Sequence, residues 1–351
     1  MAHDADLERL LRCVPPRIAA SVNGLGPELV EIALDIGRPP TARLIRGYTK
    51  LSEEPVTKEE IGYVIGAIGE FQRANRVGIE GTLHRLSAMR NRYGDWIAIT
   101  IRIGRHLTGV AAPLRPILTG TDDSILLIGA PGCGKTTLLR DCACVLSETL
   151  GPAVIVVDSH NEIGGEGDLP HPAIGTARRM QVPGPNSPAP ATQFDVMIEA
   201  VRNHFPEVVI VDEITTRQET DAARTIARRG VRLIATAHGK TLADVAHNPD
   251  LCGLVGSPAM VGQVDGARAT RTEPPIMTVA IEVHRDRTIA VHRDVAQAVD
   301  AILADAPAEP DEVVQLPVAQ QQTAPAPPPL ERTDESIPES DPWGWTEEDP
   351  T

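Results

Sequence analysis

The hydrophobic pattern in about the first 110 residues mixes alternating and helix-spaced apolar positions, which predicts a small α/β module. Strands are expected at 29–37 and 41–47, and a hairpin at 82–91 and 96–103. Helices are expected at 6–12, 17–22 and 61–74. Thr57 and Glu60 form a capping-box pattern that marks the start of the third helix.

Continuous apolar runs replace this mixture from Ser124 to about Ala246. They predict strands at 124–128, 153–157, 207–211 and 231–236, with helices at 137–150, 194–205 and 220–230 between them. Such runs are typical of a parallel sheet that helices cover on both faces. The predicted fold class is therefore α/β, with a doubly wound core that a hairpin and a helix complete over 276–303.

Charge separates the end of the chain from the rest. The net charge is −15, but residues 305–351 hold twelve acids against one arginine, so the remaining chain is close to −4. Ten prolines in this segment predict a disordered tail, whose removal should leave fold and turnover unchanged. Its "DPWGW" sequence, 341–345, is either a short docking motif or part of an unstructured end, and the second interpretation is favoured.

Other features narrow the class of protein. No apolar run approaches the roughly 20 residues of a membrane span, and the N-terminus lacks the pattern of a signal peptide. The five cysteines form no C-x-x-C pair, which suits a reducing compartment and argues against a thiolate zinc site. We therefore expect a cytoplasmic protein.

"GAPGCGKT" fulfils the phosphate-loop pattern directly after a predicted strand and at the start of a predicted helix. Its glycines allow backbone N–H groups to surround phosphates at a helix N-terminus. Lys135 would reach the β- and γ-phosphates, and the Thr136 hydroxyl would bind Mg²⁺. ATP is the expected ligand. The expected contacts are Gly129, Ala130, Pro131, Gly132, Cys133, Gly134, Lys135, Thr136 and Thr137.

A second apolar strand ends in the acidic pair Asp212 and Glu213. Parallel sheets bind their ligands at the carboxyl ends of their strands, so this pair should lie beside the phosphate loop. Asp212 would belong to the magnesium shell, largely through water, and Glu213 would polarise the attacking water. His238 ends a further strand at the same edge, where we favour a sensor of the γ-phosphate over a structural histidine.

The stretch from His160 to Pro183 follows another strand and is rich in glycine, proline and carboxylates. A metal site of His160 and His171, a disordered insertion and a loop at the nucleotide edge are the three alternatives. The apolar residues of "AIGTARRMQVP" and the absence of a helix that would hold both histidines favour the loop. Asp158 and Glu162 would then face the nucleotide. Arg178 and Arg179 would contact a neighbouring subunit or a polyanion.

The order of phosphate loop, "VVDSHNEIGG", "VIVDEI" and "TAHG" resembles the secretion-type, RecA-like AAA ATPases. It is still more similar to the stage III sporulation protein AA group and its cyanobacterial and plastid relatives, particularly at "DLPHPAIGTARRMQVP". The resemblance covers about residues 5–300. It implies an N-terminal α/β domain, a RecA-like P-loop ATPase domain and a ring, by resemblance a hexamer. We expect the domain bounds to be 1–115 and 116–304, followed by the tail, 305–351.

Within this resemblance, "AITIRIGR" matches the strand that brings an arginine to a neighbouring γ-phosphate. Arg102 is the candidate, with Arg90 behind it; whether these arginines merely line a solvated strand remains open. The Arg-x-x-x-His nucleic-acid module of many plastid relatives is replaced here by the acidic tail. Arg102 and His106 have that spacing within a strand, which we interpret as chance.

The sequence favours a Mg²⁺-dependent ATPase whose ring acts on an unidentified protein or nucleic-acid partner. A nucleotide-dependent scaffold with little turnover and a nucleic-acid translocase are the alternatives. Glu213 distinguishes the ATPase from the scaffold, because an ATPase needs a water-activating carboxylate and a scaffold does not.

Overall fold

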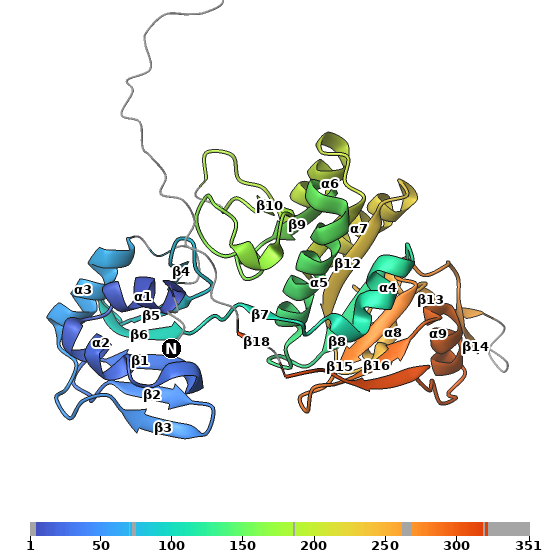
Figure 1. Ribbon diagram of the computed structural model, residues 1–351. Helices are drawn as coiled ribbons and strands as arrows, with labels where there is room; N and C mark the ends of the chain where they lie inside the picture. The colour runs from blue at the N-terminus through green and yellow to red at the C-terminus, as the bar shows by residue number, and fades with distance from the viewer. Residues whose placement is uncertain are drawn as a thin grey trace, which may run out of the picture.

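The computed structural model describes residues 5–69, 71, 75–184, 187–261, 268–318 and 320–321. Two sheets organise these residues, and they lie side by side with a short linking segment between them (Figure 1). This linking segment contains β7 (Leu107–Thr108), which pairs with β18 (Gln320–Gln321). Among the described residues, none of the helices has the length and apolarity that crossing a membrane requires.

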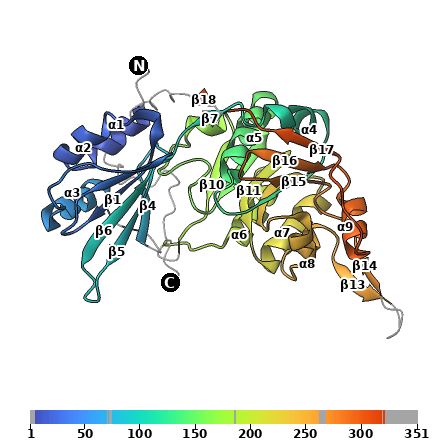
Figure 2. The ribbon, with the colours of Figure 1, turned by 90° about the horizontal axis from the view of Figure 1, so that it is seen from below.

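The N-terminal domain contains one antiparallel sheet of order β3-β2-β1-β6-β5-β4. Its strands are β1 (Leu29–Asp35), β2 (Thr41–Leu44), β3 (Gly47–Lys50), β4 (Arg76–Gly78), β5 (Arg85–Arg90) and β6 (Trp96–Arg102). Its helices are α1 (Ala5–Arg12), α2 (Pro16–Val22) and α3 (Lys58–Ile68). All three helices lie on one face of the sheet, so within the described residues the other face has no helix on it (Figures 1 and 2).

The helix-covered face holds the core of this domain, in which Ile32, Leu86 and Ile101 are fully buried. The predicted capping box is confirmed: the side chain of Thr57 accepts a hydrogen bond from the Glu60 N–H, and Glu60 reaches back to the Thr57 N–H. The predicted end of this helix, at 74, is wrong. Gly69 adopts a φ of +80°, a left-handed conformation that terminates α3.

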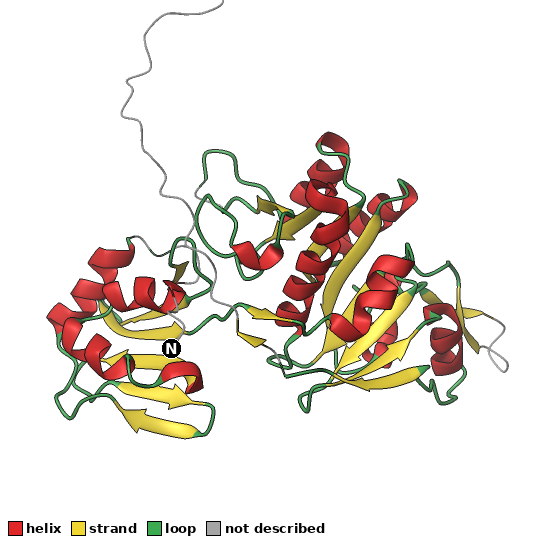
Figure 3. Ribbon diagram, in the orientation of Figure 1, coloured by secondary structure: helices red, strands yellow, loops and turns green. Residues whose placement is uncertain are grey.

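The core domain contains an eight-stranded sheet of order β10-β9-β11-β12-β8-β15-β16-β17, parallel from β10 to β15 (Figure 3). Its strands are β8 (Ile125–Gly129), β9 (Val154–Asp158), β10 (Arg178–Gln181), β11 (Val208–Ile214), β12 (Arg232–His238), β15 (Val279–Val283), β16 (Thr288–His292) and β17 (Glu312–Gln315). A separate hairpin is formed by β13 (Pro258–Val261) and β14 (Arg268–Arg271).

Helices cover both faces of this sheet, as the continuous apolar runs predict. One face packs against α6 (Gln193–Asn203), α7 (Arg217–Arg228), α8 (Leu242–His247) and α9 (Val295–Leu303). The other packs against α4 (Arg115–Gly120) and α5 (Lys135–Leu150). The four strands predicted for this core are all present. The predicted pattern for 276–303 is also confirmed, as β15, β16 and α9.

The segment from 305 onward departs from the prediction in its first part. Residues 312–315 form β17, which pairs antiparallel with β16, and the following Leu316 is 5% exposed in the core. The prediction of disorder is therefore wrong for residues 312–316, and because removal of everything after 304 would expose apolar surface, we expect that truncation to lower the stability of the fold. The "DPWGW" motif lies outside the described residues.

Candidate nucleotide-binding site

The phosphate loop connects β8 to α5 at the carboxyl edge of the core sheet. Gly132 and Gly134 have φ values of +76° and +104°, which side chains with a Cβ rarely adopt. Gly134 is the N-cap of α5 and supplies no side-chain hydrogen bond to the helix. The first N–H groups of α5 are therefore free of a side-chain cap, as binding of a phosphate group requires.

Lys135 is the first residue of α5 and is only 8% exposed. Its Nζ lies 2.5 Å from the carbonyl oxygen of Gly129 and 3.5 Å from that of Ala130. The ammonium group is thus held inside the loop whose N–H groups would surround an anion. The structure places this lysine where the motif predicts it.

Asp212, on β11, is a desolvated carboxyl group that is 5% exposed. Burial, followed by the neighbouring Asp158 and Glu213, raises its pKa to about 7, against the opposing effect of Arg140 and Lys135. A buried carboxyl surrounded by other carboxyls is stabilised as an anion by a divalent cation with oxygen ligands. Among the described residues, no cluster of three or more metal-ligating side chains is present, so Asp212 fits only a Mg²⁺ ion that takes one or two protein oxygens and keeps most of its ligands as water.

Glu213 and His238 meet at the ends of the adjacent strands β11 and β12, with 2.7 Å between Glu213 Oε1 and His238 Nε2. Their side chains are 24% and 54% exposed. The β12–β8 register places His238 opposite Gly129, the first residue of the phosphate loop. The side-chain amide of Gln193 donates to the Glu213 carbonyl oxygen at 2.6 Å. The sequence places both residues at this edge, and the structure adds their direct contact.

Asp158, at the end of β9, organises the loop that follows it. Its carboxylate accepts hydrogen bonds from the N–H groups of Glu162, Ile163 and Gly164 at 3.0, 3.1 and 2.7 Å. Asp158 is fully buried, so it shapes the loop and does not face a ligand. Glu162, by contrast, has a side chain that is 38% exposed.

Two residues of the stretch 160–183, His171 and Arg179, have their partners within the chain. Both ring nitrogens of His171 have partners: Nε2 lies 2.9 Å from Asp6, and Nδ1 accepts the Ala173 N–H at 3.0 Å. Arg179 donates to the carbonyl oxygens of Gly164, Gly165 and Gly167 within the same stretch. The expectation that Arg179 is available for a neighbour is therefore wrong, whereas Arg178 is exposed.

This pair of arginines allows a matched test of the loop. Arg179→Ala should lower the free energy of unfolding by about 3 kcal/mol, because it leaves three carbonyl groups without their charged donor. Arg178→Ala should change it by less than about 0.5 kcal/mol, as expected for an exposed side chain. Urea unfolding followed by circular dichroism measures both. Equal effects of the two substitutions would contradict the role of Arg179.

A cavity of about 700 Å³ lies between the two domains, next to Thr136. Arg85 and Arg102 line it from the N-terminal sheet, and Glu162 lines it from the core domain. Arg85 forms an ion pair with Glu162 across the cavity. Arg102 is 69% exposed, lies 3.9 Å from Glu31 and lines this cavity; its contact with a neighbouring γ-phosphate stays a prediction.

Arg90, the second candidate, lies elsewhere. Its guanidinium stacks on Trp96 at 3.5 Å and donates to the Gly94 carbonyl oxygen at the tip of the β5–β6 hairpin. The structure thus separates it from Arg102. Arg85 is the residue that sequence reasoning missed. The strand alternation could have identified it, because Arg85 lies directly opposite Arg102 on the same face.

Arg140 is a second missed residue, on α5 and 7% exposed. It donates to the carbonyl oxygens of Glu162, Ile163 and Arg105, the last in the linking segment. Burial lowers its pKa to about 10, against the effect of Asp158 and Asp212. Arg140 therefore connects the phosphate-loop helix to the Glu162 loop and to the N-terminal domain. No local sequence pattern marks this role.

A family model described as "Sporulation stage III, protein AA" matches residues 28–261, about two thirds of the chain. The chain belongs to this family. The "Uncharacterized protein ycf45" of Porphyra purpurea is 43% identical over 309 residues, which are 85% of this chain and 54% of that protein. "Protein SEEDLING PLASTID DEVELOPMENT 1" of Arabidopsis thaliana is 43% identical over 310 residues, 85% of this chain and 44% of that protein. This stage III AA family member thus spans about half the length of these two relatives.

The X-ray structure of the Legionella pneumophila ATPase DotB is similar, with a TM-score of 0.52 and 16% sequence identity. The similarity covers 84% of this chain and 85% of DotB. The stage III AA family chain therefore has the fold of a RecA-like secretion ATPase, as the resemblance implies. At this level of identity, the likeness concerns the fold alone.

Proposed function

We propose that the chain binds ATP with Mg²⁺ and hydrolyses it to ADP and phosphate. The observation that carries this proposal is the meeting of three groups at one sheet edge: the Lys135 ammonium in its loop, the buried Asp212, and the Glu213–His238 pair. An anion-binding loop, a cation-binding carboxyl and a partly exposed base are the parts that phosphoryl transfer to water needs.

The loop N–H groups and Lys135 bind the phosphates. Thr136 and Asp212 hold Mg²⁺, largely through water, and the metal neutralises charge on the phosphate oxygens when bound. Support for this assignment comes from Asp212, whose pKa is raised to about 7 because burial and Asp158 oppose its charge.

Glu213 orients the attacking water and accepts its proton. His238 holds the Glu213 carboxylate at 2.7 Å, and a γ-phosphate beside Gly129 would compete for this imidazole, which supports its role as a sensor. Glu162, Arg85 and Arg102 place opposite charges around the adjoining cavity. We assign the arginines to stabilisation of phosphate charge, from within the chain or from a neighbour.

The chain is further proposed to act in the cytoplasm as a ring, by resemblance a hexamer, that moves a macromolecular partner. The resemblance of the sequence motifs to those of the secretion ATPases supports this assembly, and the partner is a protein or a nucleic acid. The chain spans about half the length of the ycf45 and SEEDLING PLASTID DEVELOPMENT 1 relatives. Activities that belong to the remaining parts of those proteins are therefore not assigned to this chain.

Metal removal tests the central proposal. With the chain in excess over ATP, phosphate release should occur with Mg²⁺, stop in EDTA and return when Mg²⁺ is restored, because charge on the phosphates is then neutralised again. Radiolabelled ATP measures both binding and release in a single turnover. Stable binding of ATP without release in Mg²⁺ would contradict hydrolysis and favour the scaffold.

A further inference from the structure

The uncovered face of the N-terminal sheet carries a concentration of positive charge. Strand alternation and register place five cations on this face, one on each strand except β1. These cations are Arg43, Lys50, Arg76, Arg85 and Arg102, and we call their surface the basic face. Glu31 and Asp35, on β1, are the acids among them.

The charges of the basic face do not balance. Arg85 and Arg102 are directly opposite each other in the register, an arrangement that nearby anions must offset. Here Glu162 pairs with Arg85, while Glu31 lies 3.9 Å from Arg102. The pKa of Arg85 is lowered by burial first, and then by Arg76 and Arg102. Among the described residues, no ion pair involves Arg43, which is exposed. Lys50 pairs with the exposed Glu53 at 2.9 Å, so the positive charge that the described part of the chain leaves without an ion pair includes Arg43.

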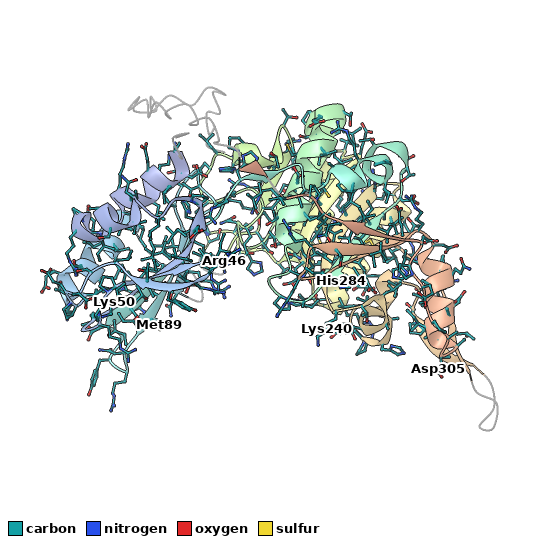
Figure 4. All side chains as sticks on the ribbon, turned by 60° about the horizontal axis from the view of Figure 1, so that its bottom comes forward. Arg46, Lys50, Met89, Lys240, His284 and Asp305 are labelled. Carbon is teal, nitrogen blue, oxygen red and sulfur yellow. The ribbon has the colours of Figure 1, made fainter. Side chains whose placement is uncertain are left out.

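This charge is local to the domain. Residues 1–115 hold sixteen Lys and Arg against thirteen Asp and Glu, in a chain whose net charge is −15. The basic face also carries Tyr48 and Met89, which are 74% and 55% exposed. Figure 4 labels Lys50 and Met89 on this domain. An anionic ligand that also has aromatic side chains would match both properties.

The described chain ends close to this face. Gln320 and Gln321 pair antiparallel with Thr108 and Leu107, so Gln321 lies beside Leu107 in the segment that follows the N-terminal sheet. Leu107 follows Arg102, the last residue of β6, by five positions, a reach of at most roughly 17 Å. Thirty residues, 322–351, follow, with eight acids, one arginine and two tryptophans, Trp343 and Trp345.

We propose that the acidic segment 322–351 docks on the basic face of its own chain. Its charge is opposite to that of the face, its tryptophans suit Tyr48, Met89 and the cations, and β18, which precedes it, pairs with β7 in the segment that follows this domain. A segment joined by a short connection has an effective concentration in the millimolar range, which favours it over a second copy or a free polyanion. The proposal does not depend on ATP hydrolysis.

The lysines of the chain allow a direct test. There are four: Lys50 on the basic face, Lys58 at the start of α3, Lys240 in the core domain and the buried Lys135. A zero-length carbodiimide links lysines to carboxylates that touch them, in the full-length chain. Mass spectrometry should find Lys50 joined to acids of 322–351 at least tenfold more often than Lys58 or Lys240. At high salt this product should fall at least fivefold, because screening weakens exposed ion pairs.

A matched pair of charge reversals completes the experiment. Arg43→Glu, on the basic face, should lower the Lys50–tail product at least fivefold, and Arg12→Glu, exposed on α1, should leave it within twofold. Equal linkage to the three accessible lysines, or none to Lys50, overturns the proposal. In a mixture of ¹⁵N-labelled and unlabelled chains, each Lys50–tail product should join two peptides of the same isotope label, because both come from one chain. Mixed products would show instead that a second copy supplies the segment, which also overturns it.

Discussion

Replacement of Glu213 by Gln should leave ATP bound and lower phosphate release by about 10²- to 10⁴-fold, the usual contribution of a positioned general base. Gln keeps the size of the side chain and can still contact His238, 2.7 Å away in the native pair. It cannot accept a proton from water. The loss should therefore fall on turnover and spare binding.

The measurement is ATP affinity and single-turnover phosphate release on the same preparation. Glu207→Gln is the matched control, since Glu207 is exposed just before β11, at the opposite end of the strand. It should release phosphate at the native rate. Native turnover in Glu213→Gln would refute this base, and Glu162, which faces the interdomain cavity, would become the candidate.

Replacement of Lys135 by Ala should weaken ATP binding by about a hundredfold or more. The ammonium group lies in the phosphate loop, 2.5 Å from the Gly129 carbonyl, and loss of its charge-assisted hydrogen bonds costs about 3 kcal/mol. At about 1.4 kcal/mol per factor of ten, this corresponds to roughly two orders of magnitude in affinity.

Equilibrium binding of a fluorescent ATP analogue measures this loss, and a melting curve checks that the variant is folded. Lys240→Ala is the control, because Lys240 follows the same sheet edge two residues after His238 but is exposed. Its affinity should match that of the native chain. If Lys135→Ala, still folded, binds ATP as tightly as Lys240→Ala, the phosphate loop is not the nucleotide site.

Most of the core sheet could be predicted because its strands are buried on both faces. The apolar runs ending in Gly129, Asp158, Asp212 and His238 form adjacent parallel strands, and parallel strands bring their carboxyl ends to one edge. The shorter elements, β10, α4 and α8, were not predicted. In β10, for example, the two arginines Arg178 and Arg179 break the apolar pattern by which a buried strand is recognised. The segment is a strand because it pairs with β9.

The limits of the elements depended on single residues and distant partners. Gly69 ends α3 although the apolar spacing continues beyond it. β17 forms because the edge of β16 offers hydrogen bonds and a place for Leu316, which composition averaged over 305–351 does not reveal. The proline and acid content of a long segment is an average over all its residues. It does not exclude a strand of four residues, which forms where a neighbouring strand offers a free edge.

The sequence by itself determined the phosphate loop, the acidic pair and the common sheet edge, because these depend on local motifs and on the direction of parallel strands. Tertiary structure alone decided which side chains meet across the domains. Arg85 reaches Glu162, Arg140 joins α5 to the Glu162 loop, and Arg179 closes its own loop. These contacts join residues with no common local pattern, so they follow from the packing of one domain against the other and of a loop against its own carbonyl groups.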